Sequence, residues 1–281
     1  YKRQLLLAAG SSAVWGAGDF YAGYLSRSRP VLNVAAISQV SALVVGAIAL
    51  VLLGQSLPTG ANLWNSLAAG ACGGFGLIAL YRALSIGVMS IAAPISALAA
   101  LVPFAWGLVE GDSPRSLQLV GGGLALLGAL LAAREPSHST VSREQFRKSV
   151  GLAAFSALAL GTGLVFLAHA SPGGAMPVLV ADRVATTAII LPLALIAREG
   201  PRGPLVGLIP PSIVGLFDTS ANALYIGAIS HGGPLSMVGL LASLYPVTTV
   251  LLARFTLNEN LERHQALGVV VALAGIALVA V

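Results

Sequence analysis

Apolar residues fill this chain in long runs that short polar breaks separate. Ten runs are each about 20 residues long, the length that an α-helix needs to cross the hydrocarbon core of a bilayer. Because backbone groups cannot stay unpaired in lipid, we expect every run to form a helix. The predicted helices cover residues 4–25, 31–53, 63–84, 90–109, 115–133, 149–169, 175–198, 206–229, 234–255 and 264–281.

The breaks between the runs are rich in glycine and proline, the strongest local turn signals. Pro172 and Gly173 mark one break, and Gly233 and Pro234 mark another. The long polar stretch from Arg134 to Ser149 predicts a linker and not a domain of its own. We therefore expect a first repeat at 1–133, a linker at 134–148 and a second repeat at 149–281.

The two halves of the chain repeat each other. The stretch ALYRALSIG from Ala79 recurs as ALYIGAIS from Ala223, a displacement of 144. Gln39 maps to Arg183 at the same displacement. Because each half has five helices, an odd number, the second half must enter the membrane from the opposite side. Inverted repeats of this kind are common in secondary transporters.

Composition excludes a soluble globular domain. Mean hydropathy is +0.89 and only 9% of residues are charged, against about a quarter in soluble proteins. The net charge of +5 does not predict nucleic-acid binding, because the charges lie in the short breaks and form no basic face. Cys72 is the single cysteine, and no His, Cys or carboxylate group has metal-ligand spacing, so no metal or other cofactor is expected.

Loop charges predict an orientation. With a cytoplasmic N-terminus, the inner loops would hold three Lys and Arg residues and the outer loops ten. Cytoplasmic loops normally carry the excess of these residues. The visible charges therefore favour both termini outside. An internally duplicated chain supplies both of its halves, so we expect a monomer.

If Arg115, Arg198 and Arg254 at the ends of their spans are counted with the loops, five charged residues fall inside the predicted spans: Asp19, Arg82, Asp182, Arg183 and Asp218. A charge at the bilayer centre costs about 2.5–3.5 kcal/mol on the insertion scale, so such residues usually line a bundle interior or a water-filled cavity. Arg82 lies near a helix end, where its side chain can snorkel to the interface. Arg183 is predicted either to bind an anion or gate the pathway, or to form a structural ion pair with Asp218 or Asp19. If protons drive transport, Asp19 or Asp218 is the expected carrier.

Three polar side chains share one helical face, because Asp218, Asn222 and Tyr225 sit at i, i+4 and i+7. They predict the wall of a polar cavity; interhelical hydrogen bonds are the alternative. Tyr245 lies mid-segment, where it fits an interfacial aromatic belt poorly. The other aromatic residues predicted to line the cavity are Trp15, Phe75, Tyr81 and Trp106, with a belt position as the alternative for Tyr81 and Tyr225.

Two further features concern proton transfer and flexibility. Histidine is the residue type best suited to proton transfer near neutral pH, so His169 is a candidate proton relay. It ends its segment beside a turn, however, where an ordinary interfacial histidine is expected. Pro103 and Pro246 interrupt helices, one in each half. Because proline removes a backbone donor and kinks a helix, we expect these two residues to act as hinges.

A series of short motifs runs through both halves of the chain: Trp15 with Gly16, then Pro246, Glu259, Gln265, Gly268 and Gly275, and in the first half Pro103, Asp112, Gln118, Gly121 and Gly128. Together with the predicted helices, these motifs resemble the drug/metabolite transporter superfamily, and within it the ten-helix EamA-type exporters. Arg183, early in its helix, also resembles a familiar position of that family. The first half follows the family pattern less closely, with Asp112 in place of Glu and a shorter spacing from Pro103.

The resemblance implies an all-α polytopic membrane protein with ten transmembrane helices in two inverted repeats. The chain is most similar to bacterial YddG-like exporters of aromatic amino acids. That likeness implies export of aromatic and other neutral amino acids across a bacterial inner membrane by alternating access. The substrate would lie among the third, fourth, eighth and ninth helices. Export of sugars, nucleotides or cationic drugs is the alternative.

The main rival is an intramembrane aspartyl protease. Gly16 to Asp19 reads GxGD, and Phe217 with Asp218 imitates the second aspartate motif of those enzymes. Their order is reversed, however, and no Pro-Ala-Leu motif is present. HExxH and GxSxG signatures are also missing from the sequence, so we expect no enzymatic activity.

Overall fold

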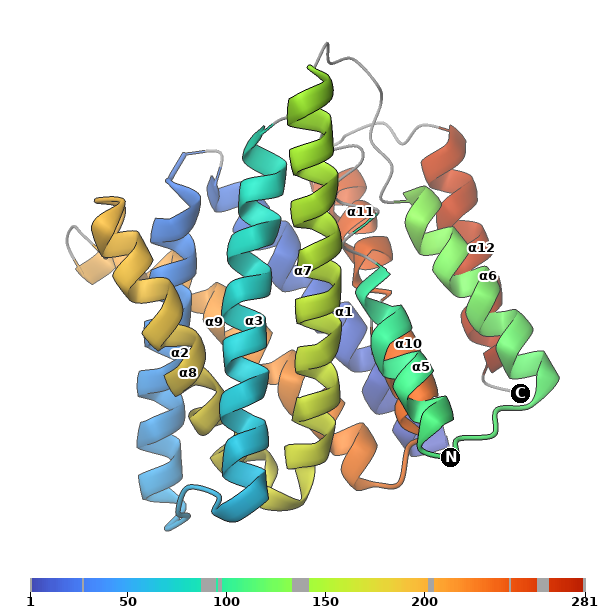
Figure 1. Cartoon of the computed structure of the whole chain (residues 1–281), viewed down its shortest axis with the longest axis horizontal. Coiled ribbons are helices and arrows are strands. Elements are labelled where there is room, and N and C mark those ends of the chain that lie inside the picture. The colour runs from blue at the N-terminus through green and yellow to red at the C-terminus, as the bar shows by residue number, and fades with distance from the viewer. Residues whose placement is uncertain are drawn as a thin grey trace.

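A computed structural model of the chain describes residues 2–26, 28–86, 95, 98–132, 142–201, 205–242, 244–256 and 263–279, and this part of the chain is helical (Figure 1). The helices are α1 (Lys2–Ser26), α2 (Val31–Leu52), α3 (Gly60–Ile86), α5 (Leu101–Val109), α6 (Ser116–Ala132), α7 (Arg143–Ala170), α8 (Ala175–Ile196), α9 (Leu205–Ser230), α10 (Leu235–Ala242), α11 (Tyr245–Thr256) and α12 (Arg263–Val279), with the 3-10 turns η1 (Leu98–Ala100) and η2 (Ser171–Gly173).

These elements confirm the predicted ten-helix membrane architecture. Within the described residues, η1 and α5 belong to one membrane segment and α10 and α11 to another, which leaves ten segments. By length and hydropathy, α2, α3, α7, α8 and α9 are each long and apolar enough to cross a membrane. The remaining apolar helices are shorter stretches at 98–109, 116–131, 235–249 and 266–275.

Local sequence sets where several helices begin and end. Ser142 and Gln145 form a capping box that starts α7 at Arg143 and not at the predicted residue 149, because the two side chains satisfy backbone donors that a helix start leaves unpaired. Gly174, with φ of 85°, separates η2 from α8, and Gly232, with φ of 80°, follows α9. Both turns need a conformation that glycine adopts at little cost.

The two halves are packed around an approximate two-fold axis. By their order in the two halves, α1 is equivalent to α7, α2 to α8 and α3 to α9. The contact between α1 and α9 is matched by the equivalent contact between α7 and α3, and the contact between α2 and α9 by that between α8 and α3. α6 and α12, the last helices of the two halves, pair with each other at one side of the bundle (Figure 1). Exchanging the halves therefore maps each contact onto another, as inverted repeats require.

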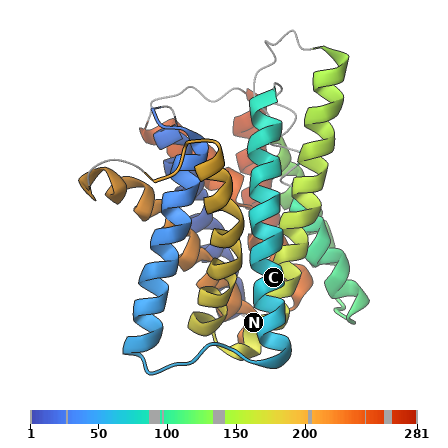
Figure 2. The ribbon, with the colours of Figure 1, turned by 60° about the vertical axis from the view of Figure 1, so that its left-hand side comes forward.

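Both termini lie at the same edge of the bundle, which we call the termini face (Figure 1). The loops after α2, α5, α7 and α9 also lie there. The C-terminal ends of α1, α3, α6, α8 and α11 lie at the other edge, the opposite face (Figure 1). Figure 2 shows α3 and α7 side by side, running between these two faces.

The fourth and ninth predicted spans are both interrupted. α10 ends at Ala242 and α11 begins at Tyr245. Between them, the backbone N–H of Leu244 donates to the carbonyl of Leu241, and the N–H of Val247 donates to the carbonyl of Leu244, so each bond closes a tight turn. Pro246 cannot donate a backbone hydrogen bond, which explains a break just before it. In the first half, η1 precedes α5 at the corresponding place. The span predicted at 234–255 therefore consists of two helices, and the break lies beside Pro246, where the sequence predicts an interruption.

Candidate functional site

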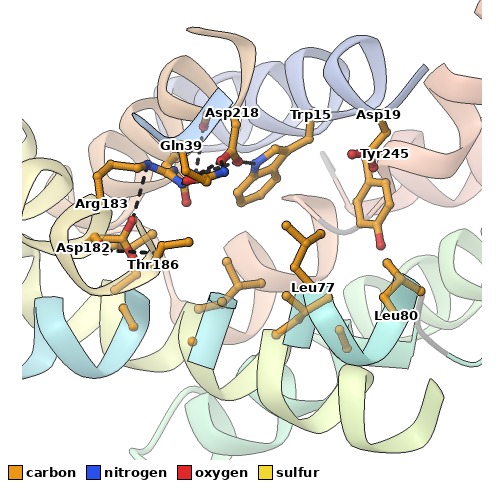
Figure 3. Close-up of a pocket in the computed structure, with 18 residues that line it drawn as sticks. Trp15, Asp19, Gln39, Leu77, Leu80, Asp182, Arg183, Thr186, Asp218 and Tyr245 are labelled. Atoms are coloured by element: carbon orange, nitrogen blue, oxygen red, sulfur yellow. Dashed lines mark hydrogen bonds and ion pairs between the residues drawn. The ribbon is translucent and has the colours of Figure 1, made fainter. Parts of the chain in front are cut away.

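A central pocket lies between the two halves. Its volume is about 200 Å³, and α1, α2, α3, η1, α7, α8, α9 and α11 all contribute to its lining (Figure 3). Its polar lining residues are Trp15, Asp19, Gln39, Asp182, Arg183, Thr186, Asp218, Asn222 and Tyr245. The remaining lining residues are small or apolar: Ala69, Gly73, Leu77, Leu80, Ala99, Leu160, Gly163, Leu164 and Leu167.

Arg183 on α8 is the centre of the polar network. Its side chain is only 4% exposed. Its Nη1 atom donates to Asp218 Oδ2 at 2.7 Å and to Gln39 Oε1 at 2.7 Å. Its Nε atom lies 3.5 Å from Asp182 Oδ2. The positive charge of Arg183 is therefore already matched by carboxylates of the protein.

Both carboxylate oxygens of Asp218 on α9 are engaged. Trp15 Nε1 and Asn222 Nδ2 donate to Oδ1 at 3.0 and 3.1 Å. Arg183 Nη1 and Gln39 Nε2 donate to Oδ2 at 2.7 and 3.5 Å. Four donors on two oxygens occupy the lone pairs that a carboxylate offers, so Asp218 ties α1, α2 and α8 to α9.

Small residues bring these helices close enough for the network to form. The carbonyl of Asp182 packs directly against Gly70 on α3, where a Cβ atom would collide with it. Thr186 Oγ1 lies 3.0 Å from the carbonyl oxygens of both Gly70 and Asp182, and its single hydroxyl proton is shared between them or donated to one. In this way α3 fixes the first turns of α8 and holds Arg183 at the pocket.

Asp19 on α1 lies at the other end of the pocket, beside Tyr245 (Figure 3). Its side chain is exposed, and no residue in the described ranges forms a hydrogen bond or ion pair with it. α11 is docked here by Thr249 Oγ1, which donates to the carbonyl of Gly16 at 3.0 Å. The carboxylate of Asp19 thus keeps its acceptor positions open toward the pocket.

The structure brings five of the predicted cavity or carrier residues together: Trp15, Asp19, Asp218, Asn222 and Tyr245 all line the pocket, with Arg183 beside them. Tyr225 lies behind this wall and is fully buried. Its ring is 6.2 Å from the ring of Trp15, and its hydroxyl donates to the carbonyl of Leu164 at 3.1 Å. It supports Trp15 from behind and does not line the pocket, because its hydroxyl is directed to the backbone of α7.

Two predicted cavity residues lie elsewhere, and these are corrections. Phe75 is 53% exposed on α3, because it falls between Gly73 and Leu77 and so points to the other side of the helix. Trp106 is 46% exposed near the termini face. Its Nε1 atom donates to Glu110 Oε1 at 2.8 Å. The side chain of Tyr81 lies outside the described residues, although its backbone belongs to α3.

His169 is placed away from the pocket, near the end of α7. Its Nε2 atom lies 2.6 Å from Glu110 Oε1, and its ring packs edge-on against Trp106 at 6.4 Å. This contact joins α5 of the first half to α7 of the second half at the termini face. Among the described residues that line the pocket, His169 is not included. Its position at the end of α7 fits the expectation of an interfacial histidine.

The expected hinge prolines lie in different surroundings. Pro103 is buried in α5 and packs on Gly239 of α10, where a Cβ atom would collide with the proline ring. The side chain of Pro246 lies outside the described residues. The two prolines are 143 positions apart. Gly16 packs against the carbonyl of Tyr245 as Gly161 packs against the carbonyl of Ala99, so structurally equivalent positions of these two spans, Ala99 and Tyr245, are 146 apart. The prolines therefore differ by three residues, about one helical turn.

Sequence reasoning missed several pocket residues. The sequence marks Gln39 only as the repeat equivalent of Arg183, yet the two side chains are in contact. Equivalent residues of two repeats meet when they lie at the two-fold axis, so the displacement of 144 contained this signal. Thr186 and the apolar residues of α7 carried no such signal, because leucine and threonine are common in every membrane helix. No group of three His, Cys, Asp or Glu side chains within the described ranges is placed to hold a metal ion.

Comparisons with known proteins agree with this architecture. The family model described as the EamA-like transporter family matches residues 2–134 and again residues 147–281. No curated protein sequence matches the chain. A crystal structure of a protein 18% identical in sequence superposes with a TM-score of 0.79, covering 98% of this chain and 97% of that one. At this identity the similarity establishes a shared fold.

Proposed function

The chain belongs to the EamA-like transporter family, and from this premise we propose that it exports amino acids, aromatic and other neutral ones, by alternating access. This family is a family of membrane transporters and not of enzymes. We therefore propose that the two repeats surround a path for a small molecule through the membrane. The amino-acid substrate, the export direction and the bacterial inner membrane are parts of our proposal.

The observation that carries the proposal is the two-sided chemistry of the central pocket. Trp15, Asp19 and Tyr245 face the apolar side chains of Leu77 and Leu80 across it (Figure 3). Ligand sites usually combine apolar walls with a few polar groups that fix orientation. A volume of about 200 Å³ lies below the roughly 300–1,000 Å³ of sites for drug-sized ligands, and so favours a small metabolite.

The position of the pocket also supports alternating access. It lies between two inverted repeats and next to the interrupted spans, where substrate sites of such transporters occur. Rocking of one repeat against the other would expose the pocket to each face in turn. Pro103 and Pro246, beside these interruptions, are the proposed hinges. We propose that a single chain performs this cycle, since it contains both repeats, and that Asp19 is the carrier if protons drive it.

Uptake into proteoliposomes tests the proposed function. The purified full chain should move radiolabelled phenylalanine, tryptophan and leucine saturably, with and without a pH gradient as the two arms. Empty liposomes provide the background. If none of these amino acids moves in either arm, the amino-acid proposal is contradicted and sugars, nucleotides and cationic drugs become the next panel.

A matched pair of tryptophan variants sharpens this test. Trp15→Phe removes the indole N–H that Asp218 accepts, and loss of such a hydrogen bond costs about 0.5–1.5 kcal/mol. We expect the initial rate of phenylalanine uptake to fall by up to about tenfold. Trp64→Phe is the control, because Trp64 is 72% exposed on the outside of α3. Equal rates for both variants would contradict a role of this pocket in transport.

A further inference from the structure

The two walls of the pocket are repeat equivalents with opposite chemistry. Gly215 on α9 packs against the carbonyl of Ser38 as Gly70 on α3 packs against the carbonyl of Asp182, so equivalent packing positions of these two helices are 145 residues apart. By this packing, Asp218 and Asn222 on α9 correspond to Gly73 and Leu77 on α3, one residue away from the displacement of 144 between the matching stretches at Ala79 and Ala223. Asp19 on α1 corresponds to Leu164 on α7, also at a displacement of 145. Hence α1 and α9 supply carboxylates and amides where α3 and α7 supply leucine or glycine. A ligand that fills this pocket must be polar on one side and apolar on the other.

The polar wall carries more negative than positive charge. Arg183 is its single described cation, and it contacts two carboxylates, Asp218 at 2.7 Å and Asp182 at 3.5 Å. Asp19 adds a third carboxylate with no described partner. An anionic ligand would therefore enter a site whose one cation is already neutralised, whereas a cationic ligand would find an unpaired carboxylate.

Asp19 is also the carboxylate with room to accept hydrogen bonds. Asp218 already accepts four donors, and Asp182 is 7% exposed. Asp19 is exposed to the pocket and lies one helical turn from Trp15 and beside Tyr245 (Figure 3). An ammonium group can donate charge-assisted hydrogen bonds to a carboxylate and is attracted to the faces of Trp and Tyr rings.

From this arrangement we infer that Asp19 binds a cationic amine and that the amine, not a carboxylate, is the obligatory feature of the ligand. The ligand class is an amphipathic amine whose apolar body lies against Leu77, Leu80 and Leu164. Zwitterionic amino acids belong to this class through their ammonium group. The inference rests on the proposed function, since it describes what the same pocket recognises.

Three probes of matched shape test the inference on the purified full chain. 2-Phenylethylamine has the amine alone, L-phenylalanine has amine and carboxylate, and 3-phenylpropanoate has the carboxylate alone. Binding of each is measured by isothermal titration calorimetry, independently of transport. We expect 2-phenylethylamine and phenylalanine to bind, and 3-phenylpropanoate to bind at least tenfold more weakly than either.

Substitutions at Asp19 identify the residue responsible. Asp19→Asn should weaken 2-phenylethylamine at least tenfold without weakening 3-phenylpropanoate, whereas Asp19→Glu should stay within about threefold of the wild type. Glu144→Gln is the control for carboxyl-to-amide exchange, because Glu144 lies on the surface of α7 paired with Lys148. If Asp19→Asn fails to fold, Asp19→Glu and the three probes on the wild type still decide the question.

The outcomes separate this inference from the proposed function. If 3-phenylpropanoate binds as tightly as 2-phenylethylamine, or if Asp19→Asn binds the amine as the wild type does, the inference is overturned. Saturable phenylalanine uptake in that case leaves the proposed transport function standing. If the wild type binds none of the three probes and transports no amino acid, both proposals fail together.

Discussion

Arg183 organises the polar side of the pocket, although a charge inside a membrane segment is costly. It is only 4% exposed, and it contacts Asp218, Gln39 and Asp182. Removing one partner of a buried ion pair leaves the other charge unpaired, which costs more than the pair itself contributes. The network therefore determines which single substitutions the pocket tolerates.

Single and paired substitutions of Arg183 and Asp218 should differ sharply. Arg183→Gln leaves Asp218 and Asp182 without their cation, and we expect a loss of about 3 kcal/mol in the free energy of unfolding. In the double variant Arg183→Gln with Asp218→Asn, the loss should be smaller than the sum of the two single losses, by at least about 1 kcal/mol. Unfolding of purified protein in detergent measures all three variants.

The exposed pair of Glu144 and Lys148, 2.6 Å apart, provides the comparison for this cycle. Surface ion pairs contribute only about 0–1 kcal/mol, so Glu144→Gln should change stability little. Additive losses for Arg183 and Asp218 would show that the ion pair seen here is not coupled in the protein.

At the scale of elements, small residues decide which helices can touch. α6 and α12 form a close pair through Gly128, which meets Ala272, and Gly275, which meets Ala125. A Cβ atom at either glycine would collide with the backbone of the partner helix. In membranes such small-residue contacts supply the close packing that the hydrophobic effect does not. We call this contact of Gly128 and Ala125 on α6 with Ala272 and Gly275 on α12 the seam; it closes the bundle between the last helices of the two repeats.

Alanine substitutions along α6 test the seam. Gly128→Ala should lower the unfolding midpoint temperature, because the added methyl group forces the two backbones apart. Gly123→Ala is the matched control on the same helix, since nothing lies within 4 Å of a Cβ atom there. Alanine favours a helix over glycine by about 1 kcal/mol, so Gly123→Ala should keep or raise the midpoint. A lower midpoint for both variants would contradict close packing at Gly128.

At the scale of the whole molecule, the ten crossings place both termini on one face (Figure 1). Basic residues gather at the opposite face, where the described ones include Arg29, Arg143, Arg147, Lys148 and Arg198. The termini face has Lys2, Arg3 and Arg115 in the described part of the chain. Since cytoplasmic loops carry the basic excess, we expect the termini face to lie outside the cytoplasm.

Cysteine labelling tests this orientation. Cys72, the single cysteine, is first replaced by alanine. Ser113→Cys places a thiol in the exposed loop between α5 and α6 on the termini face, and Ser28→Cys places one between α1 and α2 on the opposite face. In intact cells a membrane-impermeant maleimide should label position 113 and not position 28. The reverse pattern would show that the termini are cytoplasmic.

Much of the fold was predictable because the bilayer restricts what an apolar chain can do. Runs of about 20 apolar residues become helices, since lipid offers no partner for an open backbone. The odd number of helices in each half then requires inverted repeats. The break between α10 and α11 was not predictable with the same certainty, because prolines such as Pro192, Pro210 and Pro211 lie inside continuous helices of this chain.

The sequence by itself determined the membrane class, the duplication and the identity of most polar pocket residues, because a charge inside an apolar span must find an interior position. Only the tertiary structure decided how those charges are shared. It joins Arg183 to Asp218, leaves Asp19 open to the pocket, and turns Phe75 outward. These outcomes depend on which helices meet and at what rotation. Such contacts arise between residues more than 200 positions apart, as for Trp15 and Asp218 at 203 and Gly16 and Thr249 at 233, which no local pattern encodes.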